Sequence, residues 1–178
     1  PYTTLFRSYR FKSVEKNLSN SISPITPTVN QTSQSIRLQI NYIATSSVSL
    51  KTNLETSIFE TDSTNTEYGF LLAQDLNFKM NRIPVTLNLR FAIFDTPSWN
   101  TRIYSYESDM LYSFSVPAYY SNGTRLFALI KYSPKPWIDL WLRHSQTYYS
   151  KMDELGQGAD FINSNTRSEI KAMVRVKF

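Results

Sequence analysis

Residues 170–178 alternate apolar and polar side chains without a break. Because successive side chains of a β-strand point to opposite faces, this alternation predicts a strand with one apolar face and one largely cationic face. The apolar face consists of Ile170, Ala172, Val174, Val176 and Phe178. A transmembrane β-barrel suits such a strand, because lipid covers one face while water and polar side chains cover the other. A soluble sandwich can also end on a strand of this kind.

The same period of two recurs along most of the chain and predicts further strands. They are expected at residues 2–12, 36–44, 48–60, 68–79, 85–93, 126–132 and 138–143. Residues 102–120 form a stretch longer than the ~9–11 residues that a barrel strand needs. We therefore predict two strands there, separated by a turn at 107–109, which brings the expected total to ten.

The connections between these strands fall into two groups by length. Short turns are predicted at one end of the sheet, at residues 45–47, 80–83, 108–109 and 133–136. Mostly longer loops are predicted at the other end, at residues 13–35, 61–66, 95–100, 121–123 and 150–166. Bacterial outer-membrane barrels have short periplasmic turns, long extracellular loops and an even number of strands. We therefore expect an all-β fold, an antiparallel up-and-down transmembrane β-barrel of about ten strands. Residues 1–178 would form one domain, either a complete barrel or part of a larger one.

The composition supports a β-barrel and excludes several other classes of protein. The 12 Tyr, 11 Phe and 3 Trp residues suit the aromatic girdles that a barrel places at its two lipid interfaces. No run approaches the ~18 apolar residues of a spanning helix, and the mean hydropathy is −0.35. The chain has no cysteine, which excludes disulfides and thiolate metal sites. The net charge is +5, but the basic residues are spread singly along the strands, which argues against nucleic acid as a partner.

Charged residues occupy the polar face of the predicted strands and would point into the lumen of a barrel. They are Arg37, Lys51, Glu55, Asp75, Lys79, Arg90, Lys131, Asp139, Arg143, Lys171, Arg175 and Lys177. Cations outnumber carboxylates in this set, which favours an anion in the lumen, either a permeating solute or an acidic plug. The alternative is that the charges pair across neighbouring strands and are merely hydrated.

Aromatic residues are expected near the membrane borders, where they would form an interfacial girdle. They are Tyr104, Tyr106, Tyr112, Phe114, Tyr119, Tyr120, Tyr148 and Tyr149. Three polar residues, Thr52, Thr56 and Gln74, interrupt the apolar face. They mark either contact with another protein or the level of the lipid head groups.

The sequence offers no set of catalytic residues. His144 is the single histidine and precedes Ser145, but their side chains point to opposite faces of a strand, which argues against a direct hydrogen bond. A metal site built from several histidines is impossible, and the acidic residues Asp153, Glu154 and Asp160 lack the spacing of an EF-hand. We expect no catalytic residue, no metal and no cofactor.

Three stretches, residues 100–120, 141–149 and 166–171, resemble a group of uncharacterised outer-membrane barrels of Bacteroidetes, and the resemblance covers residues 36–178. The aromatic carboxy terminus is also similar to the signal by which such barrels are recognised for insertion. The resemblance implies a Gram-negative outer membrane, the barrel-assembly machinery as a partner, and a longer chain with more strands and a periplasmic domain before Pro1. Some members carry helix-hairpin-helix repeats ahead of the barrel, but this sequence has none, so a DNA-related role has no support.

We expect a non-enzymatic outer-membrane protein, porin-like in fold, that acts as an anchor or subunit of a multiprotein outer-membrane assembly. Its expected partners are outer-membrane lipid, the assembly machinery during insertion and other outer-membrane subunits, but not nucleic acid. A channel or transporter for small anionic solutes is the second hypothesis, and a barrel-embedded hydrolase that uses His144 is the third. A soluble lipocalin-like barrel is the structural rival, but a lipocalin keeps apolar residues inside, where this chain would have to hold its Lys and Arg row.

Overall fold

The computed structural model describes residues 1–17, 27–62 and 64–177. The fold of these residues is all-β, as predicted, and consists of an eight-stranded antiparallel sheet and a two-stranded sheet. The large sheet contains β1 (Tyr2–Asn17), β2 (Thr28–Ile43), β3 (Val48–Thr61), β4 (Thr64–Lys79), β5 (Val85–Thr96), β8 (Ser121–Lys135), β9 (Ile138–Tyr149) and β10 (Thr166–Val176). The small sheet pairs β6 (Ile103–Tyr104) with β7 (Ala118–Tyr119), and two short 3-10 helices are η1 (Trp99–Thr101) and η2 (Gly158–Asp160).

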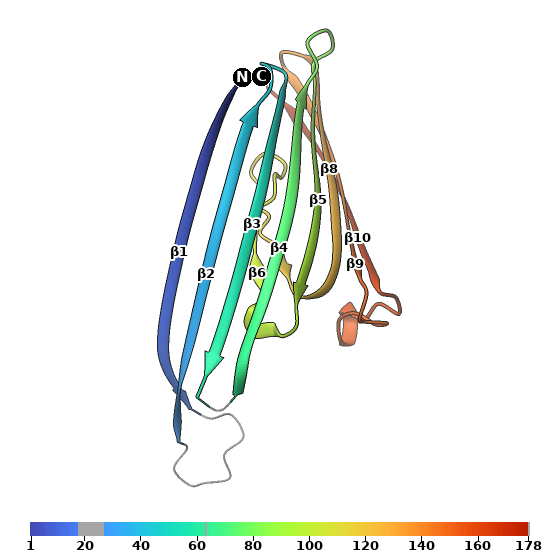
Figure 1. Ribbon diagram of the computed structural model, residues 1–178. Coiled ribbons are helices and arrows are strands. Elements are labelled where there is room, and N and C mark those ends of the chain that lie inside the picture. Colours follow the sequence, from blue (N-terminus) through green and yellow to red (C-terminus); the bar gives the residue numbers. More distant parts are fainter. Residues whose placement is uncertain (18–26, 63, 178) are drawn as a thin grey trace.

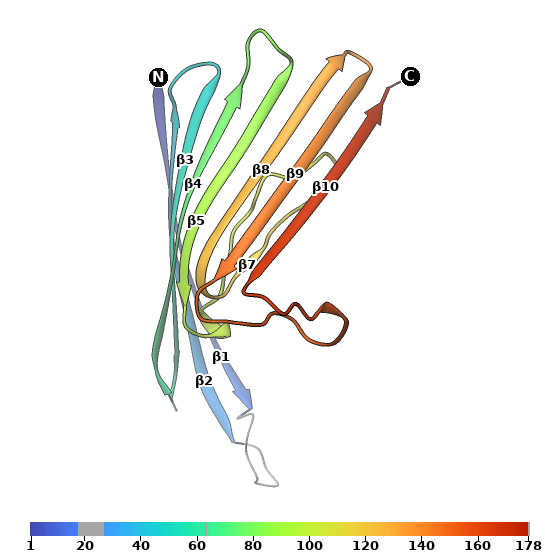
Figure 2. The ribbon, with the colours of Figure 1, turned by 90° about the vertical axis from the view of Figure 1, so that its right-hand side faces the viewer.

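The large sheet has an up-and-down topology, with strand order β1-β2-β3-β4-β5-β8-β9-β10. It is long and strongly curved, so that it has a convex and a concave face (Figures 1 and 2). Among the strands that the structure describes, β1 pairs only with β2 and β10 pairs only with β9. The sheet is therefore open at two edges in this structure.

Apolar and charged side chains lie on opposite faces of the large sheet, as their alternation predicted, and the apolar ones are on the outer, exposed face. Large apolar side chains are exposed on the convex face, and Val174, for example, is 63% exposed. Others on this face are Ile36, Leu54, Tyr68, Phe70, Leu72, Phe91, Ile93, Leu126, Ile130, Leu142 and Ile170. The concave face instead buries charged residues, including Arg90 at 2% and Arg143 at 1% exposure. A water-soluble barrel such as a lipocalin has the opposite arrangement.

Residues 97–120 correct the predicted strand order. We expected two barrel strands here, but β5 pairs directly with β8, from Val85 opposite Tyr132 to Thr96 opposite Ser121. Residues 97–120, which we call the inner segment, instead lie on the concave face of the large sheet (Figure 2). The predicted turn at 107–109 is also wrong, because Glu107 forms an antiparallel bridge with Ser115 and the chain turns at residues 111–112 instead. The Glu107 side chain is fully buried against the large sheet.

The connections between strands still differ between the two ends of the sheet. Turns at residues 44–47, 80–84 and 136–137 lie at the end where β1 begins and β10 finishes, and residues 97–120 and 150–165 connect strands at the other end (Figure 1). This separation holds without two strands in residues 102–120, because eight strands, like ten, are an even number. Three predicted loops were too long or misplaced: β1 and β2 extend into residues 13–35, β4 begins at Thr64, and residues 121–123 start β8. The part of the first loop at residues 18–26 lies outside the described residues.

A small apolar core lies between the inner segment and the middle of the sheet. Its buried residues include Leu71 and Phe94 of the sheet and Ile103 and Tyr119 of the inner segment. The ring of Phe94 contacts that of Tyr119 edge-on, with 5.3 Å between ring centroids. Gly69 of β4 allows the close approach, because a Cβ there would lie 2.7 Å from the carbonyl oxygen of Thr101. The core thus joins the inner segment to one part of the sheet.

Candidate functional site on the concave face

The inner segment begins with a locally encoded turn. Ser98 caps η1: its hydroxyl accepts a hydrogen bond from the Asn100 amide at 3.2 Å, and its own amide donates to Thr101 Oγ1 at 3.4 Å. Two arginines of the large sheet then bind the backbone that follows. Arg37 Nη2 donates to the Tyr104 carbonyl at 3.2 Å, and Arg90 Nη1 donates to the Tyr106 carbonyl at 2.7 Å. The segment therefore crosses the concave face along a row of cationic side chains.

Glu107 is the centre of the strongest contact between the inner segment and the sheet. Its Oε1 accepts hydrogen bonds from Arg125 Nε at 2.7 Å and from the Tyr119 hydroxyl at 2.8 Å. Its Oε2 accepts from Arg125 Nη2 at 2.9 Å and from Arg143 Nη2 at 2.6 Å. Four donors compensate the cost of burying this carboxylate. Burial raises the pKa of the Tyr119 phenol, and the negative charge of Glu107 adds to the increase.

Further ion pairs extend from Glu107 toward the edge strand β10. Arg143 Nη1 lies 3.3 Å from Glu169 Oε2, and Lys171 Nζ lies 3.3 Å from Glu169 Oε1. Asp109 of the inner segment completes the set, at 3.7 Å from Arg143 Nε and 3.8 Å from Lys171 Nζ. We call these residues the anchor network: Glu107, Asp109, Glu169, Arg125, Arg143 and Lys171. It contains three carboxylates and three cations, so its formal charges balance.

Three other groups of ion pairs hold most of the remaining charges that the sequence analysis placed in a lumen. Asp75 binds both Arg90 and Lys51, the latter at 2.9 Å, and Glu55 binds Arg37 at 2.7 Å. Near the end of the sheet where β10 finishes, Asp139 binds three cations, which are Arg175, Lys177 at 3.0 Å and Lys131 at 3.9 Å. The charges thus pair across neighbouring strands, which is the alternative stated from the sequence. Lys79 lies on the same row as Asp75 but forms no ion pair with any residue that the structure describes.

Two aromatic rings form cation–π contacts with four of these cations. The guanidinium groups of Arg90 and Arg143 lie 5.6 and 5.4 Å from the ring centroid of Phe127. Lys131 Nζ and the guanidinium of Arg175 lie 5.3 and 5.4 Å from the ring centroid of Trp141. Each ring therefore stabilises two cations through its negatively charged face.

Several residues of the site were missed or misplaced by the sequence analysis. Arg125 continues the alternate row of Lys131 in β8, and Glu169 continues that of Lys171 in β10, but the predicted strands began one residue too late to include them. Glu107 and Asp109 had no signal of their own, because a Glu-Ser-Asp sequence is also typical of a turn. The girdle prediction is wrong for seven aromatic residues. Tyr149 of β9 is buried on the concave face, and the other six belong to the inner segment on the same side: Tyr104, Tyr106, Tyr112, Phe114, Tyr119 and Tyr120.

The convex face carries the remaining residues that the sequence analysis singled out. Ile170, Ala172, Val174 and Val176 are exposed there, whereas Phe178 lies outside the described residues. Thr52 Oγ1 donates to Gln74 Oε1 at 2.7 Å, so these two polar residues satisfy each other. His144 lies on this face and Ser145 is buried on the concave face, as their alternation predicted. In the described ranges, no helix is long and apolar enough to cross a membrane, and no three His, Cys, Asp or Glu side chains are grouped to hold a metal ion.

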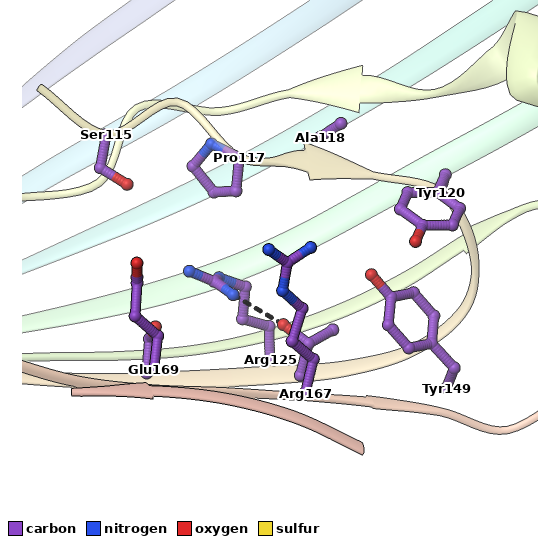
Figure 3. A pocket seen from close by; sticks show the side chains of 10 residues that line it. Ser115, Pro117, Ala118, Tyr120, Arg125, Tyr149, Arg167 and Glu169 are labelled. Carbon is purple, nitrogen blue, oxygen red and sulfur yellow. Dashed lines mark hydrogen bonds between the residues drawn. The ribbon is translucent and has the colours of Figure 1, made fainter. Parts of the chain in front are cut away.

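A cavity of about 280 Å³ lies beside the anchor network, between the inner segment and the start of β10. Figure 3 shows Arg125, Tyr149, Arg167 and Glu169 on the sheet side of the cavity and Tyr120 on the side of the inner segment. Arg125 also donates from Nη1 to Thr147 Oγ1 at 2.6 Å, which holds its guanidinium at the cavity wall. Guanidinium and hydroxyl groups at one cavity provide hydrogen-bond donors for an anionic or hydroxylated solute.

Comparison with family models, with curated proteins and with solved structures gave no match.

Proposed function

We propose that this protein is an integral outer-membrane β-barrel protein of a Gram-negative bacterium, without enzymatic activity, that acts as an anchor or subunit of an outer-membrane assembly. The observation that carries the proposal is the inverted polarity of the sheet. Val174 is 63% exposed on the convex face, while Arg90 is 2% exposed on the concave face. Water penalises large apolar side chains that are exposed on one face, whereas the hydrocarbon of a bilayer does not.

The strand lengths support the same proposal. β5 and β9 have 12 residues each, which corresponds to about 40 Å at ~3.3 Å per residue. A tilt of about 45° reduces this span to about 28 Å, close to the ~30 Å thickness of the hydrocarbon core. These two strands therefore have about the length that a bilayer requires, and β1, β2 and β4, with 16 residues each, would extend beyond it.

The open edges of the sheet indicate how such a barrel would be completed. Backbone groups at an open strand edge have no partner in hydrocarbon, so a membrane-spanning sheet must close. An eight-stranded barrel has an interior just wide enough for side chains, but this sheet also holds the inner segment on its concave face. We therefore propose that further strands lie between β10 and β1, in agreement with the longer barrel that the resemblance noted in the sequence implies. Ten strands, the number expected from the sequence, is then a lower bound.

A substitution on each face of β5 tests the membrane proposal. Phe91→Lys places a charge on the convex face, whereas Asn88→Lys places the same charge on the concave face of the same strand. In a bilayer we expect Phe91→Lys to lower the free energy of unfolding by about 2–4 kcal/mol, because a lysine near the bilayer midplane is costly. The measurement is urea unfolding of the whole protein in lipid vesicles, after heat-modifiable migration on a gel has shown that each variant is folded.

Asn88→Lys is the matched control for Phe91→Lys. Asn88→Lys should cost less than about 1 kcal/mol, because its ammonium meets water and polar side chains. Equal effects of the two substitutions, or recovery of the whole protein as a monomer without detergent, would contradict a lipid-facing convex surface.

A channel or transporter for small anionic solutes is the second candidate function. Its support is that the concave face carries Lys79 and Arg167, neither of which forms an ion pair with a residue in the described ranges. The inner segment lies across the same face and supplies two carboxylates, Glu107 and Asp109, to the cations there. Such an acidic plug would restrict an open pore, so we rank the channel below the anchor. Conductance of the reconstituted protein, with its ion preference, distinguishes them.

A further inference from the structure

We propose that the cavity between the inner segment and β10 binds a small hydroxylated solute that carries a single negative charge, such as a sugar acid. The proposal begins with the charge of Arg167. The anchor network beside the cavity is balanced, with three carboxylates and three cations. Arg167 adds a further cation beside this network; its side chain is exposed, and it makes no ion pair with any residue in 1–17, 27–62 or 64–177. The cavity lining thus carries one positive charge in excess, with Arg125 and Arg167 against Glu169, and a single negative charge on a solute would balance it.

The direction of the Arg167 side chain agrees with this role. Figure 3 shows its guanidinium pointing into the cavity, between Arg125 and Tyr149. Arg125 is already held by Glu107 and by Thr147, at 2.7 and 2.6 Å. Arg167 is therefore the arginine whose donors are available to a solute, and a guanidinium binds a carboxylate through two parallel hydrogen bonds.

Two tyrosines supply further recognition groups next to Arg167. The rings of Tyr120 and Tyr149 lie 5.1 Å apart between centroids, with 37° between their planes. Their hydroxyl ends face each other at the cavity in Figure 3. A phenol both donates and accepts hydrogen bonds, as the hydroxyl groups of a polyol or sugar do. Thr147 of β9 and Ser115 of the inner segment add one hydroxyl group to each of the two walls of the cavity.

Glu169, at the end of the cavity away from the two tyrosines, limits the charge of the solute (Figure 3). Glu169 lines the cavity together with Ser115, and its carboxylate would repel a second anionic group placed there. A solute with its carboxylate at Arg167 and neutral hydroxyl groups toward Glu169 satisfies both ends. The volume of about 280 Å³ is at the lower limit of sites for small molecules, which suits one sugar ring and not a chain of several.

The test is a titration of the whole folded protein in detergent micelles with D-glucuronate, in which binding is measured by isothermal titration calorimetry. We expect saturable binding that weakens at least about tenfold in Arg167→Gln, because a charge-assisted bidentate contact is lost. Arg82→Gln is the matched control, because it removes the same charge from the exposed turn at 80–84, at the other end of the sheet. Arg82→Gln should bind D-glucuronate as the unmodified protein does.

Two further measurements separate the expected class from its rivals. D-Glucose, which has the same ring without the charge, should bind at least about tenfold more weakly than D-glucuronate. Tyr149→Phe should weaken binding of D-glucuronate severalfold, because one hydroxyl partner is lost. Absence of D-glucuronate binding, equal binding of D-glucose, or unchanged binding in Arg167→Gln would overturn the proposal. Binding is read independently of membrane insertion, so a failure of the barrel proposal and a failure of this site give different results.

Discussion

The half of the large sheet around β9 and the half that begins with β1 share the same alternation of side chains. They differ in what covers their concave face. In β9, every second residue from Asp139 to Tyr149 is buried. In β1, every residue except Val14 is exposed. The inner segment and its ion pairs cover the strands around β9, whereas β1 contacts one neighbouring strand in the part of the chain that the structure describes. Alternation thus decides which face a side chain occupies, but the inner segment decides which of those side chains are buried.

The largest expected effect comes from removing the Glu107 carboxylate, which joins the inner segment to the strands that it covers. Glu107→Ala leaves the guanidinium groups of Arg125 and Arg143 without their main partner in a buried site. Breaking a buried ion pair from one side costs about 3–5 kcal/mol. We expect the free energy of unfolding to fall by this amount, measured by urea unfolding in detergent with tryptophan fluorescence. Glu15→Ala, on exposed β1, is the control and should change it by less than about 0.5 kcal/mol.

If instead Glu107→Ala unfolds at the same urea concentration as the unmodified protein, the inner segment is not held by this contact. Limited proteolysis gives a second measurement, because release of the inner segment should expose residues 97–120 to cleavage before the large sheet unfolds.

A pair of phenylalanine substitutions compares the covered and uncovered sides directly. Phe94 is 1% exposed and contacts Tyr119 and Tyr149 across the core, whereas Phe6 of β1 is 51% exposed. Phe94→Ala should lower the free energy of unfolding by about 3 kcal/mol, because it leaves a cavity between the sheet and the inner segment. Phe6→Ala should cost about 1 kcal/mol or less in the same urea measurement. Similar losses at both positions would mean that β1 is covered by further protein to the same extent as β5.

A smaller effect is expected where an ion pair lies at the boundary of the covered region. The Arg37 side chain is 37% exposed and pairs with Glu55 at 2.7 Å. Exposed pairs contribute about 0–1 kcal/mol, because water and salt screen them. Arg37→Gln should therefore destabilise the protein by less than about 1 kcal/mol, and high salt should reduce the difference. A loss as large as that of Glu107→Ala would show that the contact of Arg37 with the Tyr104 carbonyl is the main anchor.

The smallest expected effect is a dependence of stability on alkaline pH. A phenol has an ordinary pKa of about 10, and burial beside Glu107 raises the pKa of Tyr119 above that value. The unfolded chain therefore releases this proton first, so the stabilisation is complete below about pH 10 and is lost as pH rises toward the folded value. Between about pH 9 and 11 the free energy of unfolding should decline more steeply for the unmodified protein than for Tyr119→Phe. Parallel declines would assign the alkaline loss to other groups.

The amino-acid sequence alone determined the all-β class and the face that most side chains occupy. The reason is that alternation along a strand is local, so the position of a residue in the strand decides the face to which its side chain points. It placed Val174 and Ile170 on one face and Arg143 and Lys171 on the other from residue order alone. Only the tertiary structure decided the place of residues 97–120, since Glu107 in a turn and Glu107 in the interior have the same local sequence. The difference is made by Arg125 and Arg143, whose guanidinium groups reach the carboxylate after distant strands have paired. The cavity beside Arg167 depends on the same long-range packing, because its two walls come from the inner segment and from strands β8 to β10.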